Sequence, residues 1–356
     1  MYIIGFAGSC VRNPYADPSV REHLPLNASA MRTPFGSLRN AVIATLCGIP
    51  ATAIAMDPGI VKPGAPTKNC AQPEPILQSY QPITGGYTHD SNDTGFLDVN
   101  LSIKIRLLPC SVTPSFMQPY FAMATRFGFY WGTRPNSPVI GKSYNPLILL
   151  RFLPTRETIS SPNGRSFERA EYVDVVPYAH ESNGQLIHTP EQYKAQLESL
   201  KIVSYTNNFI HRGWDYAGIA WKKTYSPDIT TYLEGRYFFQ DGFLQGPADE
   251  YHSWEDNPKG KPRKAVDGLS AAIEYPSSYA HFPVDSDRFL SRPNLTVKYL
   301  TGYDTPFRYS TGRVELGFQV FSLPLAVWIQ HGYMSSLAMY YEKVTSLGIE
   351  LRFESF

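Results

Sequence analysis

A histidine and a serine stand two positions apart in the stretch PYAHESNGQ, at positions 177–185. A serine hydroxyl becomes a useful nucleophile when a neighbouring base takes its proton, and imidazole is a common base for this purpose. If the stretch is a β-strand, His180 and Ser182 lie on the same face and can meet. Two polar residues at this spacing also occur by chance in many proteins, so the motif alone carries little weight. The chemistry therefore depends on the kind of strand that positions the pair.

Period-two alternation marks the strands of this chain. The stretch GFLDVNLSIKIRLLP, at positions 95–109, places apolar residues on one face and polar residues on the other. The apolar face comprises Val99, Leu101, Ile103, Ile105 and Leu107, and the polar face comprises Asp98, Asn100, Ser102, Lys104 and Arg106. About twelve such stretches of ~10 residues follow Pro75, and this length crosses a bilayer when the strand is tilted. One strand of a soluble β-sandwich would look the same, so the recurrence of the pattern is the stronger signal.

Composition agrees with a membrane barrel and excludes a nucleic-acid-binding protein. The 356 residues include 32 Lys and Arg against 31 Asp and Glu, and no basic stripe is interleaved with aromatics, so no nucleic-acid partner is predicted. Aromatic residues make up 14% of the chain, with 24 Tyr and 20 Phe. Aromatic side chains gather at the two rims of membrane barrels, where they meet the lipid head groups.

The connections and the C-terminus favour the same fold class. Short turns alternate with long polar loops, and the chain ends in SLGIELRFESF, whose apolar face ends near Phe356. An open sheet edge cannot lie in lipid, so the strands must close on themselves. The predicted fold is an all-β transmembrane antiparallel β-barrel of about twelve strands over 75–356, with long extracellular loops and short periplasmic turns.

The first part of the chain is predicted to be an export signal. Residues 31–55 combine two arginines, an apolar run from Ala41 to Ala53 and a small-x-small cleavage site. Residues 1–30 are interpreted as a non-native upstream extension, and 56–74 as a periplasmic N-terminal segment. Cys70 and Cys110 remain after cleavage, and an oxidising compartment makes a disulfide between them a hypothesis.

The predicted topology brings a third residue to the histidine and serine. With the N-terminus in the periplasm, the strand from Glu171 to Ser182 is the fifth and runs outward, so its motif lies near the outer leaflet. The next strand returns antiparallel and begins with RGWD, which makes Asp215 a cross-strand neighbour of His180. Asp215 can then orient the imidazole, and the backbone N–H of Gly184 can approach an oxyanion.

Several neighbouring residues are expected to have structural roles instead. Glu181 alternates with His180 and is expected to point into the barrel. A second His-x-Ser pair, His89 and Ser91, follows two glycines and is interpreted as a solvated loop. Trp214 and Trp254 are interpreted as anchors at the membrane interface.

Five motifs in order resemble outer-membrane phospholipase A. They are YAHESNG, TRPNSPVIGKSYNP, the GWD of the sixth strand, WEDNP and HGYMSSLAMYYEKVTSLGIEL. The resemblance implies a twelve-stranded barrel, active as a calcium-dependent homodimer, that hydrolyses acyl esters of phospholipids (A1, A2 and lysophospholipase activity) in the outer membrane of a Gram-negative bacterium. It implies that His180 is the general base and Ser182 the nucleophile. Asp215 stands where the family usually has asparagine, and a carboxylate facing lipid is more costly than an amide, so a loop or a partner subunit is expected to cover it.

The resemblance also implies a set of calcium ligands. The matching positions are Gln185, His211, Asn136 or its neighbour Ser137, and Asp256. Calcium prefers oxygen ligands, so His211 departs from the family's chemistry. The loop Asn183–Arg212, which contains Gln185 and His211, also holds TPEQYKAQLESLK, which is predicted to form a short helix capped by Thr189.

Two other functions remain open from the sequence. A lipid A deacylase also carries His-x-Ser on a barrel strand near the outer leaflet. A porin or structural barrel would contain the same pair without using it. The polar interior positions Asp98, Lys104 and Arg106 suit either a channel or a plugged wall.

Overall fold

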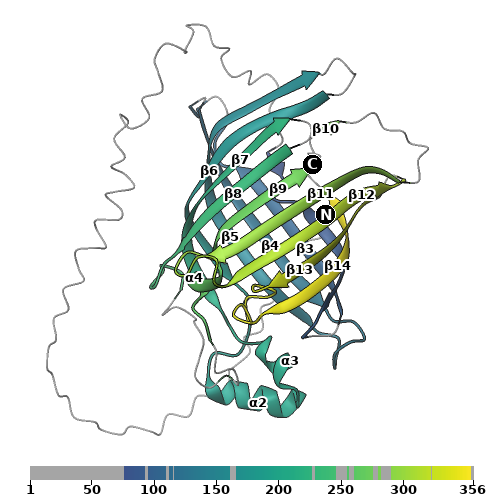
Figure 1. Cartoon of the computed structure of the whole chain (residues 1–356). Coiled ribbons are helices and arrows are strands. Elements are labelled where there is room, and N and C mark those ends of the chain that lie inside the picture. Colours follow the sequence, from purple (N-terminus) through teal and green to yellow (C-terminus); the bar gives the residue numbers. More distant parts are fainter. Residues whose placement is uncertain are drawn as a thin grey trace, which may run out of the picture. The chain divides into compact units, whose positions relative to one another are not determined.

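The computed structural model describes residues 76–92, 95–109, 112–114, 116–160, 166–226, 229–245, 255, 260–275, 280–281, 290–321 and 323–353 (Figure 1). Several sequence predictions fall outside these residues. They are the upstream extension 1–30, the signal peptide 31–55, the segment 56–74, the cysteines Cys70 and Cys110, Trp254 and the calcium ligand Asp256.

Twelve antiparallel strands form a closed barrel. They are β2 (Ile83–Asp90), β3 (Phe96–Arg106), β4 (Met117–Phe129), β5 (Val139–Ser160), β6 (Ser166–Ser182), β7 (Gly213–Ser226), β8 (Ile229–Phe238), β9 (Gly268–Tyr275), β11 (Leu290–Gly302), β12 (Ser310–Val320), β13 (Leu323–Gly332) and β14 (Val344–Phe353). Each strand pairs with the next of this series, and β14 pairs with β2 to close the ring. Two-residue strands, β1 (Leu77–Gln78) and β10 (Ala280–His281), add to β3 and β6. The predicted fold class is confirmed.

Strand β3 shows that the outer surface of this barrel is apolar, as expected of a surface that contacts lipid. Its apolar side chains face outward, where Leu101 is 43% exposed, whereas Ser102 and Lys104 are 1% and 4% exposed in the interior. A soluble sandwich would bury the apolar face and expose the polar one. The same outward apolar pattern recurs at Leu347 and Ile349 of the last strand. The alternation read from the sequence therefore describes a membrane barrel turned apolar side out.

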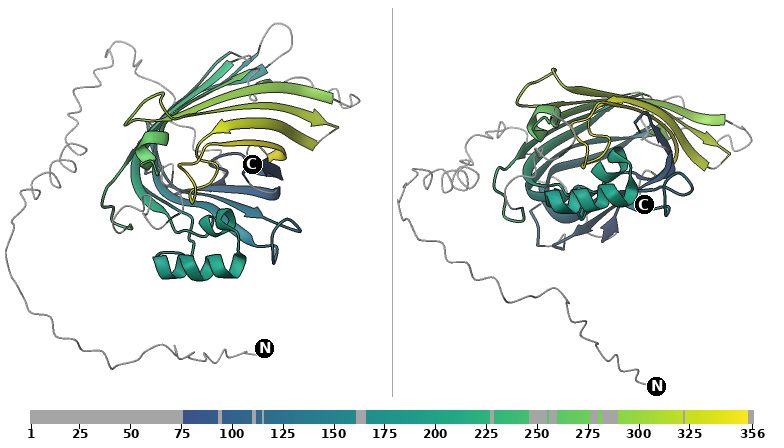
Figure 2. Two further views of the ribbon diagram at one scale, coloured as in Figure 1. Left: turned by 60° about the horizontal axis from the view of Figure 1, so that its bottom comes forward. Right: turned by 90° about the horizontal axis from the view of Figure 1, so that it is seen from below.

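The described parts of the connections contain three helices. Helices α2 (Pro190–Leu200) and α3 (Val203–Asn207) lie in the β6–β7 connection and project beyond the strand ends, and α4 (Arg263–Val266) precedes β9 (Figures 1 and 2). The predicted cap of α2 is present, because the Thr189 side chain accepts a hydrogen bond from the Gln192 N–H. None of the helices in the described part of the chain is long and apolar enough to cross a membrane.

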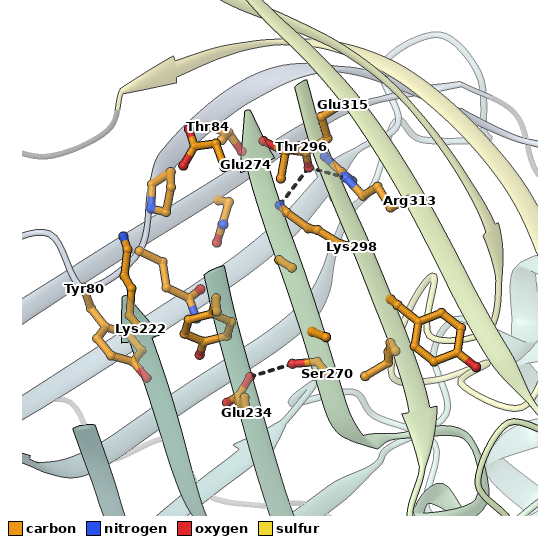
Figure 3. Close-up of a pocket in the computed structure, with 18 of the residues that line it drawn as sticks. Tyr80, Thr84, Lys222, Glu234, Ser270, Glu274, Thr296, Lys298, Arg313 and Glu315 are labelled. Carbon is orange, nitrogen blue, oxygen red and sulfur yellow. Dashed lines mark hydrogen bonds and ion pairs between the residues drawn. The ribbon is translucent and has the colours of Figure 1, made fainter. Parts of the chain in front are cut away.

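The barrel interior is packed at one level and hollow at another. An apolar cluster, the aromatic plug, joins strands β4 to β8 to the β13–β14 connection. It includes Tyr120, Trp214, Tyr216, Phe238, Leu337, Tyr340 and Tyr341. A polar cavity of about 720 Å³ lies inside the barrel and is lined by charged side chains, including Glu234, Lys298 and Arg313 (Figure 3). Its carboxylates are paired, as when Glu315 binds Lys298, Arg313 and Arg352 together.

A β-bulge in β6 determines which way the histidine and serine point. Three steps along β6, from Val176 to Ala179, face two steps along β7. Likewise, the three steps from Val175 to Tyr178 face two steps along β5, so β6 carries one extra residue at this level. Pro177 lies in the bulge, where its missing N–H costs no ladder hydrogen bond. Before the bulge Asp174 and Val176 are buried inward, and after it Ala179 is. The bulge therefore moves the even-numbered residues from the interior to the lipid face.

Three structural roles predicted from the sequence can be assessed. Glu181 does point inward, where it accepts a hydrogen bond from Arg263. Two interpretations were wrong. His89 lies in strand β2 and not in a loop, because Gly85 and Gly86 are tolerated within the ladder between β14 and β3. Trp214 is 1% exposed inside the aromatic plug and is not an interface anchor, because its position in β7 has inward parity.

Candidate active site

His180 and Asp215 form the predicted cross-strand pair. They are register partners in β6 and β7, and His180 Nδ1 lies 2.6 Å from Asp215 Oδ1. The His180 side chain is 19% exposed and the Asp215 side chain is fully buried. Because Asp215 accepts a hydrogen bond from Nδ1, the proton of the neutral imidazole is on Nδ1 and Nε2 is free to accept one. This is the tautomer that a general base requires.

Ser182 follows on the same face of β6, at the outer end of the strand. It is half-buried, with Tyr144 of β5 and Gly213 of β7 as its register partners. Among the described residues no hydrogen bond joins its hydroxyl to His180. Such bonds are often long in enzymes without substrate and tighten when the substrate is bound, so the arrangement is compatible with nucleophilic catalysis.

Asn183 holds the chain in place immediately after the serine. Its side chain donates to the carbonyl of Ile210 at 2.8 Å and accepts from the N–H of Arg212 at 2.9 Å. Its own N–H donates to the Arg212 carbonyl at 3.1 Å. The residue is 1% exposed, so each of these bonds satisfies a buried polar group. Asn183 thereby fixes Ser182 and Gly184 against the far end of the β6–β7 loop.

Gly184 has the backbone conformation that only glycine adopts readily. Its φ is +58°, in the left-handed region, and its residue is exposed beside the Tyr144 ring. A Cβ here would make an ordinary contact with that ring, so the requirement for glycine is conformational and not steric. In this conformation the chain turns away from the barrel just after the serine. Its N–H donates to no acceptor among the described residues, which leaves it available for an oxyanion.

The segment Phe239–Gln245, which we call the clasp, covers Asp215. The Leu244 N–H donates to Asp215 Oδ2 at 2.8 Å, and the Asp215 N–H donates to the side-chain oxygen of Gln245. Gly242 packs so closely on the carboxylate that a Cβ would collide with it. The expected cover over this lipid-facing carboxylate is therefore present, and it comes from the chain's own β8–β9 connection.

Two of the predicted calcium ligands lie together at the base of the β6–β7 loop. The His211 ring forms a hydrogen bond with the Gln185 backbone. It also packs on the His188 ring, with the ring centroids 4.3 Å apart. Burial, together with the neighbouring histidines, lowers the pKa of His211 to about 4, so its imidazole is neutral at physiological pH.

Two further predicted calcium ligands, Asn136 and Ser137, lie in a different loop. Asn136 and Ser137 belong to the β4–β5 loop, where both have positive φ, and the Ser137 hydroxyl accepts from the Gly132 N–H. No group of three or more His, Cys, Asp or Glu that could hold a metal is found in the part of the chain that the structure describes. With the Gln185 backbone engaged by an imidazole and a nitrogen in place of an oxygen ligand, the described residues do not fit calcium.

Several residues that position the three central side chains were not predicted from the sequence. They include Pro177, Tyr178, Asn183, Gly242, Leu244 and Gln245. A proline inside an apolar strand was the available signal for the bulge. The contact of Gly242 with Asp215 joins residues on different elements, and no local pattern marks it. After the bulge, His180 and Ser182 alternate with the buried residues Ala179 and Glu181, so the site lies on the lipid-facing wall.

Comparison with known proteins identifies the fold. No protein-family model and no curated protein sequence matches the chain. The solved structure of outer-membrane phospholipase A from Escherichia coli has a TM-score of 0.52 and 16% identity, with 77% of this chain and 98% of that chain covered. The outer-membrane phospholipase dimer with bound calcium from Salmonella typhi gives 0.53 and 18%, with 80% and 96% covered. At this identity the likeness establishes a shared fold, which agrees with the resemblance read from the sequence.

Proposed function

We propose that this chain is an outer-membrane phospholipase that hydrolyses acyl ester bonds of phospholipids. One observation carries the proposal. His180 Nδ1 lies 2.6 Å from Asp215 Oδ1 on the lipid-facing wall, and Ser182 follows on the same face at the end of β6. A base with a fixed tautomer beside a hydroxyl is the arrangement that ester hydrolysis requires. The shared fold with the two phospholipases supports the same reaction class.

The proposed first step transfers the acyl group to the protein. Ser182 Oγ attacks the ester carbonyl carbon while His180 Nε2 takes the hydroxyl proton, and Asp215 stabilises the imidazolium that forms. The negative charge that develops on the carbonyl oxygen is met by the Gly184 N–H. When the intermediate collapses, the ester bond breaks and His180 returns its proton to the departing lysophospholipid alcohol.

The proposed second step releases the fatty acid. Water loses a proton to His180 and attacks the acyl-serine, and the same N–H again meets the oxyanion. The serine leaves with the proton from His180, so the enzyme is restored and one water has been consumed for each ester. No step uses calcium, because the described residues do not fit that ion.

The barrel interior supports an enzyme more than a porin. The aromatic plug fills the barrel between β4, β8 and the β13–β14 connection, and Arg212 is buried within it, paired with Glu255 and in contact with the Tyr340 ring. A porin needs a continuous aqueous path through this level. Asp98 is one of the interior polar residues that the sequence left open between a channel and a plugged wall. It forms an ion pair with Arg126 across the interior face of the strands.

The location and assembly follow from the same proposal. The outward apolar face suits the outer membrane of a Gram-negative bacterium, and phospholipid is the expected substrate. A homodimer is the expected active form, since the related Salmonella typhi protein is a dimer. Cross-linking in detergent with and without a non-hydrolysable lipid analogue would show whether substrate shifts this chain from monomer to dimer.

A serine-reactive probe would test the proposal at the level of one residue. A fluorophosphonate should label the wild-type protein on Ser182 and should leave Ser182→Ala unlabelled. His180→Ala should abolish labelling as well, because the hydroxyl then lacks its base. Labelling of Ser182→Ala at the wild-type rate would place the reactive serine elsewhere and overturn the assignment.

A further inference from the structure

The carboxylate of Asp215 accepts three hydrogen bonds. His180 Nδ1 lies 2.6 Å from Oδ1, whereas the Tyr178 hydroxyl and the Leu244 N–H both donate to Oδ2, at 2.5 and 2.8 Å. The Asp215 side chain is fully buried although it lies on the outer wall of the barrel. A buried carboxylate is costly unless each oxygen is hydrogen-bonded. Tyr178 therefore supplies one of the hydrogen bonds that this buried carboxylate needs.

Tyr178 reaches Asp215 because of the bulge at Pro177. It is the first residue after the proline on the lipid-facing side, two positions before His180, so both side chains lie on one face of β6. Its ring stacks on Phe239 of the clasp, with the centroids 6.4 Å apart. Tyr178 thus touches Asp215 through its hydroxyl and the clasp through its ring.

The clasp and the tyrosine hydroxyl are joined to each other as well. The Leu244 N–H lies 3.1 Å from the Tyr178 hydroxyl oxygen in addition to its bond with Asp215. The Phe239 N–H donates to the Asp215 carbonyl at 2.9 Å. Tyr178, Asp215 and the clasp therefore form one hydrogen-bonded unit, and rotation of the carboxylate would break two bonds to Oδ2.

Chemistry at Oδ2 decides which side chain fits this unit. The Tyr178 hydroxyl can either donate or accept, but the Leu244 N–H can only donate. An amide at position 215 that kept its oxygen toward His180 would turn its own N–H groups toward Leu244, so two donors would face each other. A carboxylate accepts on both oxygens and satisfies all three partners.

We propose that Tyr178 is a positioning residue for the catalytic pair: with the Leu244 N–H it holds the Asp215 carboxylate so that Oδ1 faces His180. This role rests on the proposed ester hydrolysis and adds to it a fourth side chain and the clasp. The contacts of Tyr178 are with Asp215 and with the clasp residues Phe239 and Leu244. Its contribution passes through Asp215 alone.

The direct test replaces Tyr178 with phenylalanine, which removes one oxygen atom and keeps the ring on Phe239. We expect kcat on phospholipid in mixed micelles to fall about tenfold, equivalent to ~1.4 kcal/mol, with KM unchanged. We also expect the acid limb of the pH–rate profile to move to higher pH, because a carboxylate that has lost a donor holds the imidazolium more strongly. Tyr275→Phe is the matched control, because Tyr275 is an exposed tyrosine at the C-terminal end of β9, outside the clasp and the site. Its kcat and pH–rate profile should equal those of wild type.

A double-mutant cycle separates positioning from a general loss of stability. In an Asp215→Asn background we expect Tyr178→Phe to change kcat by less than about twofold, because the carboxylate on which it acts is absent. Equal losses in both backgrounds would overturn the proposal, as would a Tyr178→Phe protein with wild-type kcat and pH profile. If wild type itself hydrolyses no phospholipid, the proposed function fails; if wild type is active and Tyr178→Phe is unaffected, only this inference fails.

Discussion

Two His-x-Ser pairs lie on the outer wall of this barrel, and only one has the neighbours that chemistry needs. His89 lies near the end of β2 and Ser91 in the turn just after it, whereas His180 and Ser182 both lie at the end of β6. Across the strand pair, His89 faces Leu347, whereas His180 faces Asp215. The Ser91 hydroxyl accepts from the N–H of Thr345 and so helps to hold the β2–β14 ladder.

The difference shows that spacing within a strand does not make a catalytic site. Both pairs satisfy the same local pattern, and both histidines are on the lipid-facing side. What separates them is supplied by other elements, namely a carboxylate from β7 and a clasp from the β8–β9 connection. Each prediction below either removes one of these additions or tests whether it matters.

Insertion of one alanine between Ala179 and His180 should have the largest effect. The added residue shifts the alternation of β6 by one position and would turn His180 and Ser182 into the barrel. We expect hydrolysis to fall by about 10⁶-fold, the loss found when nucleophile or base is removed. Fatty-acid release from mixed micelles measures this. Pro177→Ala keeps the bulge residue and should retain most activity. A fully active insertion variant with the heat-resistant mobility of a folded barrel would contradict the requirement for an outward-facing pair.

Asp215→Leu makes the β6 pair resemble the β2 pair, with a leucine opposite the histidine. We expect kcat to fall about 10⁴-fold, because the imidazole loses its orienting partner. The Tyr178 hydroxyl and the Leu244 N–H would also lose their acceptor. Steady-state kinetics on the purified variant measures the loss.

The reciprocal change sharpens the same comparison. Leu347→Asp, made in the Ser182→Ala protein, gives His89 a facing carboxylate but no clasp to cover it. We expect no hydrolysis above background. Activity that appears in this variant and is lost with Ser91→Ala would show that the cross-strand acid is sufficient without its cover.

Gly184→Ala should have a smaller effect. The left-handed backbone at φ +58° costs an L-residue roughly 1–2 kcal/mol, and relief of that strain would turn the N–H away from the oxyanion. We expect kcat to fall about tenfold with KM little changed. Gly132→Ala is the control, since Gly132 has φ +70° with open space around a Cβ and lies in another loop. Equal losses in the two variants would assign the effect to folding.

Removal of calcium should have the smallest effect. Because the described residues do not fit the ion, we expect hydrolysis with chelator and with added calcium to agree within about twofold. A rate that collapses with chelator and returns with calcium would show that the ion is held by residues outside those described, such as Asp256. The same assay with magnesium controls for general effects of divalent cations on the micelles.

The sequence predicted the fold and the central contact because both depend on regular periodicity. Alternation fixed the barrel and the fifth strand, and antiparallel pairing placed Asp215 beside His180. The capped helix after Thr189 followed from local chemistry in the same way. The outward direction of His180 and Ser182 was assumed from the sequence without the bulge at Pro177. Regular alternation from Asp174 onward would have placed both side chains in the barrel interior.

The sequence could not predict contacts between elements that are not related by strand alternation or by strand pairing. The clasp folds back from the β8–β9 connection onto β7, and its key group is a backbone N–H at Leu244, which any residue but proline supplies. Trp214 was placed at the interface by its type, although its strand position put it in the barrel. The family resemblance suggested calcium, and the surroundings of His211 are what argue against it.

The most direct measurement is release of fatty acid from phospholipid in mixed detergent micelles by refolded protein beginning at Met56. Wild type, Ser182→Ala and Ser91→Ala would be compared at equal amounts of heat-resistant folded barrel. We predict hydrolysis by wild type and by Ser91→Ala, and none above background by Ser182→Ala. Wild-type rates from Ser182→Ala, or no hydrolysis by a correctly folded wild type, would contradict the proposal that the β6 pair is a catalytic site.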